Sequence, residues 1–363
     1  MPLPTIPDYS NAIINPALVH PTVLKGGHPI EKNNHLIRYA GGFCVVFPYQ
    51  SPTQKYAVRC WHAEVADIKK RTQIIADALR DSHLPYFVGF DYFEKGIMTT
   101  QGMQPVVVMD WVEAKALKKF IAEHINEKDA LLRIAENFKT MVSDLHQHHL
   151  AHGDLQHGNI MVRPDNSLVL VDYDSMYTPM LKGMKDEIKG LLGYQHKSRW
   201  TNQYVTEKAD YFSELVIYLS LRALAKYPML WNELKMEDSE TMLFSAEDIS
   251  SMGASSIFRR LKADEDLASM VDKLCEFMHK DSIEELEPLE DAIIPRSEKI
   301  VGGIIGKWGN GYARPQVRSG KSDSADGIVG KWKGGRVSSS TSSVEKTIGK
   351  LSENISEKFR RQK

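Results

Sequence analysis

The sequence predicts an α+β fold of two lobes, a β-rich lobe followed by a helical lobe. Two observations carry this prediction. Residues 36–112 are dominated by short runs of β-branched and aromatic residues, whereas residues 116–150 and 210–292 repeat apolar residues at helical spacing. A strand-rich part followed by a helical part favours two packed layers with a cleft between them.

The elements of the first lobe follow from local pattern. Strands are expected over 43–47, 55–61, 87–93 and 105–111, with a turn-prone QSPT stretch between the first two. An amphipathic helix is expected over 62–80, where Ile68, Ile75 and Leu79 recur among charged residues.

Composition excludes several classes of protein. The 363 residues are 42% hydrophobic and 26% charged, which is typical of a globular protein in water. Three widely spaced cysteines argue against a disulfide framework or a zinc cluster and favour a reducing, cytoplasmic location. No secretory signal is recognised in residues 1–20, and the most apolar run, 215–224, is too short to span a bilayer.

The net charge of −1 hides a division along the chain. Residues 296–363 hold 15 Lys or Arg and 6 Asp or Glu, a net charge of +9, which leaves −10 for residues 1–295. The same segment is rich in Gly and Ser and poor in long apolar runs, so we expect a basic tail that is mostly disordered. Beyond this basic tail nothing indicates a nucleic-acid partner.

A short motif recurs in the tail. IIGKW at 304–308 returns as IVGKW at 328–332, and IGKL at 348–351 resembles a third copy. Repeats of this length are too short to pack as solenoid units, so we interpret them as linear motifs that dock a protein partner, either a substrate or a regulator. Drift within a low-complexity tail is the alternative.

Candidate catalytic residues lie where the helices of the second lobe are interrupted. A helix expected over 131–149 leads into His152-Gly153-Asp154, and two short apolar runs flank the turn-prone sequence RPDNS at 163–167, which predicts a β-hairpin. Asn159 precedes the first strand of this hairpin and Asp172 follows the second, so both should lie at the same end. Asn159 and Asp172 can supply the hard oxygen ligands that Mg²⁺ needs beside nucleotide phosphates, and Asp154 can deprotonate an attacking hydroxyl.

HGDLQHGN at 152–159, followed by DYD at 172–174, resembles the catalytic and metal-binding loops of the protein-kinase-like superfamily. YAVR at 56–59 resembles the strand that carries the phosphate-binding lysine, and DYFS at 210–213 the start of a buried helix. Up to about residue 295 the chain resembles a bacterial group of serine/threonine kinase-like proteins. The fold implied is a bilobal kinase-like one, with an N-terminal extension and N-lobe at 1–112, a C-lobe at 113–295 and the tail at 296–363.

The resemblance implies ATP and Mg²⁺ as cofactors and a role for each matching residue. Asp154 and Gln156 would be catalytic, and Asn159, Asp172 and Asp174 would hold the metal. The remaining implied residues would contact the nucleotide: Gly41 and Gly42 in the phosphate lid, Arg59 at the phosphates, and Asp110 and Val112 in the adenine-binding hinge.

Departures from the pattern fall on this machinery. Arg59 stands where these folds have lysine, and a planar, permanently charged fork grips phosphate differently from an ammonium group. The helix after residue 62 offers only Gln73 and Asp77 where a glutamate is usual, and Gln156 replaces another lysine. No Ala-Pro-Glu platform for a peptide substrate is evident near 193–199.

Three functions therefore remain open. The first is an active ATP- and Mg-dependent phosphotransferase, a bacterial serine/threonine protein kinase. The second is a pseudokinase scaffold that binds nucleotide without turnover. The third is a small-molecule kinase. Glycine at 153, before Asp154, and aspartate at 174, where protein kinases have glycine, resemble small-molecule kinases and favour this function. The tail repeats oppose it.

Overall fold

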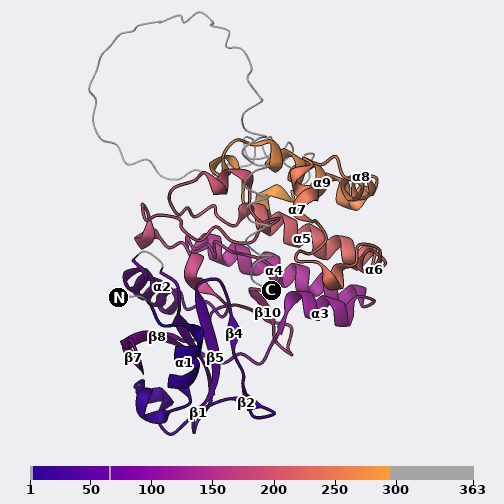
Figure 1. The fold of residues 1–363 in the computed structure, drawn as a ribbon. Helices are drawn as coiled ribbons and strands as arrows, with labels where there is room; N and C mark the ends of the chain where they lie inside the picture. Colours follow the sequence, from indigo (N-terminus) through magenta and orange to yellow (C-terminus); the bar gives the residue numbers. More distant parts are fainter. Residues whose placement is uncertain (1–2, 65–66, 295–363) are drawn as a thin grey trace, which may run out of the picture. The chain divides into compact units, whose positions relative to one another are not determined.

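The computed structural model describes residues 3–64 and 67–294, all of which fall in one compact unit. It confirms the predicted α+β class: strands dominate up to Asp110 and helices follow from Leu117. Figure 1 shows the large sheet grouped with α1 and α2, and the later helices grouped with each other.

The N-terminal part is built on a six-stranded sheet with the order β1-β5-β6-β8-β7, in which β4 also pairs with β5. All its pairs are antiparallel. The strands are β1 His28–Pro29, β4 Tyr39–Ala40, β5 Cys44–Gln50, β6 Lys55–Trp61, β7 Phe90–Thr99 and β8 Gly102–Asp110. A small separate hairpin joins β2 Glu31–Lys32 to β3 His35–Leu36.

A helix packs on each face of this sheet. The side chains Tyr9 and Ile13 of α1 (Ile6–Ile13) join Phe47 and Val58 in one buried cluster. On the other face α2 (Ile68–Ser82) contributes Ile75 and Leu79 to the large core, together with Trp61, Phe90 and Val107. Because side chains alternate across a strand, both faces of β5, β6 and β8 can be apolar and covered.

The C-terminal part is helical. Its centre is α5 (Tyr211–Lys226), whose residues are nearly all buried and which packs against α4 (Lys128–Gln147). The other helices are α3 Leu117–His124, α6 Leu230–Glu233, α7 Ala246–Ser250, α8 Ser256–Lys262, α9 Glu265–His279 and α10 Leu289–Ala292. Over the described residues, every helix is too short or too polar to cross a membrane.

The predicted hairpin is confirmed. Strand β10 (Ile160–Val162) pairs antiparallel with β11 (Leu168–Leu170), and β9 (Lys115–Ala116) lies on the other side of β10. Asn166, with a φ of 67°, makes the turn. The seven 3-10 helices found over the described residues span Pro16–Leu18, Thr22–Leu24, Tyr173–Ser175, Pro179–Leu181, Lys197–Trp200, Met236–Asp238 and Ile283–Glu285.

Some predicted boundaries shift. The helix expected over 62–80 begins only at Ile68 and runs to Ser82, and the strands expected over 87–93 and 105–111 extend toward each other into β7 and β8. The pairing of β7 with β8 shifts register between Phe93 and Ile97, an irregularity that the alternating pattern alone does not reveal.

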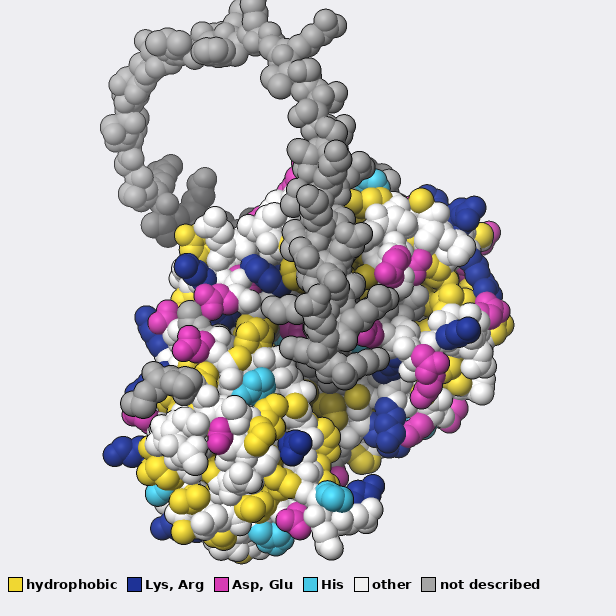
Figure 2. Space-filling model, viewed as in Figure 1, with side chains coloured by type: hydrophobic (Ala, Val, Ile, Leu, Met, Phe, Trp, Pro, Cys, Tyr) yellow, Lys and Arg dark blue, Asp and Glu magenta, His cyan; other side chains and the backbone are white. Residues whose placement is uncertain are grey.

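The predicted basic tail and its repeats, at 296–363, lie outside the described residues. On the face shown in Figure 2, Lys/Arg and Asp/Glu side chains are interspersed over the helical part. The acidic excess of residues 1–295 is therefore not gathered into one patch on that face.

Candidate active site

Asp210, the residue before α5, accepts two backbone hydrogen bonds from the loop at 151–159. Asp210 Oδ1 accepts the Gly153 N–H at 2.9 Å, and the other carboxylate oxygen accepts the His152 N–H. The His152 ring lies 2.9 Å from the Val171 carbonyl oxygen, which joins the loop to the end of β11. The buried helix α5 begins at Tyr211, which confirms the prediction that residues 210–213 open a buried helix. The hydrogen bonds to Asp210 hold the loop against this helix.

Gly153 is required by the path of this loop. Its φ is +76°, and a Cβ at this position would lie 2.1 Å from the Ser175 carbonyl oxygen. A side chain here would push the loop away from the segment after Asp172. The close approach explains why glycine precedes Asp154 in this chain.

Asp154 is covered on two sides. Its Oδ1 accepts the Leu191 N–H at 2.9 Å, and its Oδ2 accepts from the Asn159 side chain at 3.0 Å. Burial raises the pKa of Asp154, and neighbouring Asp172 adds to the effect, while His152 and these hydrogen bonds oppose it. A carboxylate whose pKa is raised holds an accepted proton more strongly, which suits a general base.

Asn159 and Asp172 come together at the end of the β10–β11 hairpin, where the pairing predicts them. The Val171 N–H donates to the Asn159 carbonyl oxygen at 3.0 Å. Asn159 Nδ2 donates to the main-chain oxygen of Asp154 at 2.8 Å as well as to its carboxylate, so its Oδ1 faces the other way. The Asp172 side chain is half exposed, and Asp172 has a φ of 68° that turns the chain sharply after β11.

Arg59 links the N-terminal sheet to the segment that follows β11. From β6, its Nη2 donates to Asp172 Oδ1 at 2.9 Å and also bonds Asp174 Oδ2. Arg59 is 3% exposed, so burial works against its charge, but Asp174 and Asp172 outweigh it and raise the pKa of the guanidinium. Burial raises the pKa of Asp174 to about 6, although Arg59 lowers it.

The carboxylate opposite Arg59 therefore comes from Asp174 and not from α2. Gln73 and Asp77 are exposed on α2, and Asp77 pairs with Arg80. The buried charged residue of α2 is Arg71, whose Nε donates to the Asp174 carbonyl oxygen at 2.9 Å. The sequence offered a signal for it, because Arg71 lies three residues after Ile68 and four before Ile75 on the apolar stripe.

The residues expected at the nucleotide occupy the N-terminal sheet. Gly41 and Gly42 are exposed at the tip between β4 and β5, and Gly42 has open space where a Cβ would be. At the end of β8, Asp110 Oδ2 accepts the Gly89 N–H at 3.2 Å and Oδ1 accepts from Gln54 at 2.9 Å. The Asp110 side chain thus joins the end of β8 to the residues just before β7 and β6. Val112, two residues after Asp110, is half-buried.

Gln156 has a local partner. Its Oε1 accepts the Gly158 N–H at 2.6 Å, which closes the turn between Asp154 and Asn159. Of the ten predicted site residues, the structure brings together Asp154, Asn159, Asp172, Asp174 and Arg59. It places Gln156 in the loop between them, and the nucleotide-side residues along the sheet.

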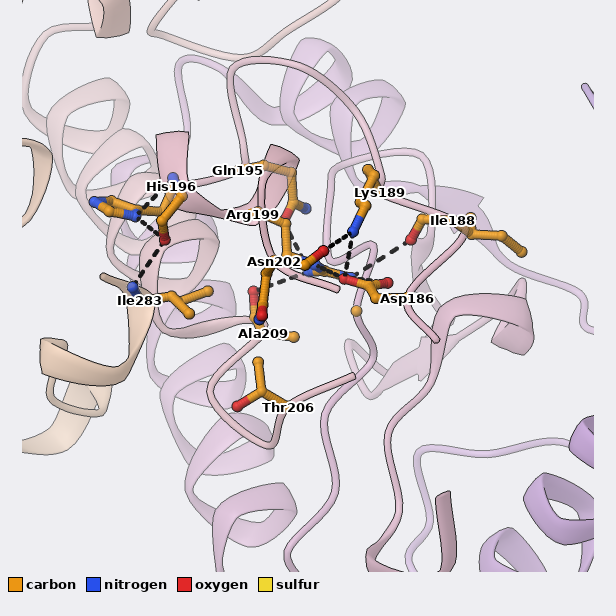
Figure 3. A network of polar contacts seen from close by, with 12 residues as sticks. Asp186, Ile188, Lys189, Gln195, His196, Arg199, Asn202, Thr206, Ala209 and Ile283 are labelled. Atoms are coloured by element: carbon orange, nitrogen blue, oxygen red, sulfur yellow. Dashed lines mark hydrogen bonds and ion pairs between the residues drawn. The ribbon is translucent and has the colours of Figure 1, made fainter. Parts of the chain in front are cut away.

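A buried ion pair that no sequence pattern indicated lies in the segment from Asp174 to Asp210. Arg199 Nε donates to Asp186 Oδ2 at 2.5 Å and Nη2 to Oδ1 at 3.2 Å, and Arg199 is 1% exposed. Figure 3 shows this pair at the centre of a polar network that includes Lys189 and Gln195. Asp186 and Arg199 lie outside any long helix or strand, so no periodicity marks them.

Residues 96–193 match the family model of the ABC1 atypical kinase-like domain. The matched stretch contains the Asp154 loop, Asn159, Asp172 and Asp174, but begins after Arg59 and the Gly41–Gly42 turn. No curated protein matches the chain. The chain thus carries, over residues 96–193, a domain similar to the atypical kinases of the protein-kinase-like superfamily.

Proposed function

We propose that the protein is an ATP- and Mg-dependent phosphotransferase whose acceptor is a protein serine or threonine hydroxyl. The observation that carries the proposal is the meeting of Asp154, Asn159 and Asp172 at one end of the β10–β11 hairpin, beside Arg59. The similarity of residues 96–193 to an atypical kinase-like domain supports it.

The residues present fit a magnesium ion. Asn159 turns its Oδ1 away from Asp154, and Asp172 keeps one carboxylate oxygen that Arg59 does not hold. An amide oxygen and a carboxylate oxygen are ligands that Mg²⁺ accepts, with phosphate and water completing its shell. Over residues 3–64 and 67–294, no group of three or more His, Cys, Asp and Glu side chains is placed to bind a metal by itself. When bound, the ion would neutralise the charge of the phosphates.

Asp174, predicted as a metal ligand, fits a different role better. Its side chain is 8% exposed and is bonded to Arg59, so it supplies the negative charge that keeps this buried guanidinium in place. In the proposed reaction Arg59 binds phosphate, and Asp154 accepts the proton of the attacking hydroxyl.

A second candidate function is nucleotide binding without transfer. It is favoured by one contact, because Arg59 holds Asp172 and Asp174 together and so occupies an oxygen of the metal ligand Asp172. If that ion pair persists with nucleotide bound, the protein would act as a scaffold.

Incubation of the full chain with ATP labelled on the γ-phosphate, with Mg²⁺, separates these functions. We expect label transfer to protein or release of phosphate, lost in Asp154→Ala and Asp172→Asn but kept in Asp91→Asn, an exposed aspartate of β7 that serves as the matched control. Loss of a general base costs about 10²- to 10⁴-fold in rate. Binding of ATP with no transfer by the wild-type chain would leave the scaffold function.

A further inference from the structure

Gln195 is a buried amide whose NH2 group has no hydrogen-bond partner among the described residues. The side chain is 3% exposed, and its Nε2 is shielded from solvent. A buried donor without a partner costs about 1–3 kcal/mol, so such groups in folded proteins call for a specific reason.

The orientation of this amide is fixed by its other end. Gln195 Oε1 accepts from Arg199 Nη1 at 3.0 Å. Arginine only donates hydrogen bonds, so the oxygen must face Arg199 and the NH2 group must face away from it. Arg199 itself donates two hydrogen bonds to the Asp186 carboxylate, as Figure 3 shows, so a buried network sets the position of the donor.

The NH2 group lies beside the proposed catalytic base. A Cβ built on Gly190 would be 2.7 Å from Gln195 Nε2 and 2.6 Å from Asp154 Oδ1. Gln195 Nε2 and Asp154 Oδ1 therefore both lie beside the Gly190 backbone and close to one another. Gly190 has a φ of +77° and no side chain, which allows this approach.

We infer that Gln195 is a further residue of the acceptor site, which donates a hydrogen bond from Nε2 to the acceptor oxygen while Asp154 takes that oxygen's proton. This inference rests on the proposed phosphotransfer and narrows its acceptor to a hydroxyl group. A hydroxyl has one proton for Asp154 and two lone pairs, one for Gln195 and one for attack. An amine has one lone pair, which attack consumes, so it cannot also accept from Gln195.

The proposed transfer forms one bond, breaks one bond and moves one proton. The acceptor oxygen forms a bond to the γ-phosphorus, the bond from that phosphorus to the oxygen of ADP breaks, and the hydroxyl proton moves to the Asp154 carboxylate. In this structure the Gly190–Leu191 backbone lies against both groups, and the Leu191 N–H donates to Asp154 Oδ1, so this backbone would move aside when the acceptor binds.

Two substitutions test the role of Gln195, with water as the acceptor and ATP hydrolysis by the full chain as the assay. Gln195→Glu keeps the oxygen that accepts from Arg199 but removes the donor. Gln195→Met removes both and adds no charge. We expect kcat to fall on the order of a hundredfold in both variants, with the Kd for ATP·Mg²⁺ unchanged. Gln203→Glu, an exposed glutamine of the same segment, is the matched control and should keep its kcat.

Each other pattern overturns the inference. Loss in Gln195→Met alone, with a lowered Tm, means that Gln195 only supports Arg199. Loss in Gln195→Glu alone means that the added charge, and not the lost donor, is responsible. Full activity in both variants removes Gln195 from the site. A wild-type chain that does not hydrolyse ATP, or does so equally with Asp154→Ala, would instead contradict the proposed phosphotransfer and this inference with it.

Discussion

At the residue scale, Arg59 and Asp174 form a buried pair whose members depend on each other. Their side chains are 4% and 8% exposed. Removing one partner of such a pair leaves an uncompensated charge inside the protein, which costs far more than the pair contributes as a whole.

Arg59→Met is therefore expected to lower the free energy of unfolding by about 3–5 kcal/mol, because it leaves Asp174 without its counterion. In an Asp174→Asn background the same substitution should cost much less, since no buried carboxylate remains next to it. Urea unfolding of the four proteins at pH 7 measures the difference. Equal costs in both backgrounds would show that the two side chains are not coupled.

Gly153→Ala tests the close approach of the loop at 151–159 to the segment after Asp172. Gly183→Ala is the matched control, because Gly183 also has a positive φ, +84°, but has nothing within 4 Å of an added Cβ. The control should cost about 1–2 kcal/mol from backbone strain alone. Gly153→Ala should cost more and should also lower kcat, because the clash with Ser175 displaces Asp154. Similar stability and rates in the two variants would contradict the stated contact.

At the scale of elements, a histidine joins three helices of the C-terminal part. His146 of α4 bonds Glu214 of α5 at 2.8 Å and Glu290 of α10 at 3.0 Å. Burial lowers the pKa of His146, but the two glutamates outweigh it and raise that pKa to about 9. Burial also raises the pKa of Glu214, against the influence of His146, so the pair carries a real desolvation cost.

The stabilisation from His146 should be present in full below its unfolded pKa of 6.5 and lost as the pH rises through about 9, since the folded state holds the proton more tightly. We expect the free energy of unfolding to fall by about 2–3 kcal/mol over this range in the wild-type chain, at 1.36 kcal/mol per pKa unit. His146→Gln should flatten the dependence, and His279→Gln, exposed on α9, should not. Urea unfolding between pH 6.5 and 9 measures this, and an unchanged slope in His146→Gln would refute the assignment.

At the scale of the whole described unit, several hydrogen bonds join the segment before β7 to the helical part and to the loop after β11. The Leu170 N–H donates to the Tyr86 carbonyl oxygen at 2.8 Å, and the Tyr86 hydroxyl donates to Asp144 of α4 at 2.6 Å. Tyr173 is the residue between Asp172 and Asp174 in the sequence. Its hydroxyl accepts the Val88 N–H at 3.1 Å. These hydrogen bonds join the segment between α2 and β7 to β11, to α4 and to Tyr173.

The sequence predicted the parts of this site that local pattern controls. The RPDNS turn set the β10–β11 hairpin, and strand pairing then required Asn159 and Asp172 to meet. It did not predict that Asp174 would replace a helix glutamate, because that depends on how α2 docks and not on spacing along the chain. The Asp186–Arg199 pair and the Leu191 contact to Asp154 lie outside the long helices and strands, where side-chain partners are set by tertiary packing.

The Mg²⁺ dependence of ATP affinity, measured by calorimetry on the full chain, tests the proposed metal site. Addition of Mg²⁺ should tighten ATP binding in the wild-type protein and in Asp174→Asn, because Asp172 and Asn159 hold the ion. Asp172→Asn should lose this tightening while it remains folded. ATP affinity in the wild-type chain that ignores Mg²⁺, or an Asp172→Asn variant that responds to it as the wild type does, would contradict the central claim that these residues form an ATP·Mg²⁺ site.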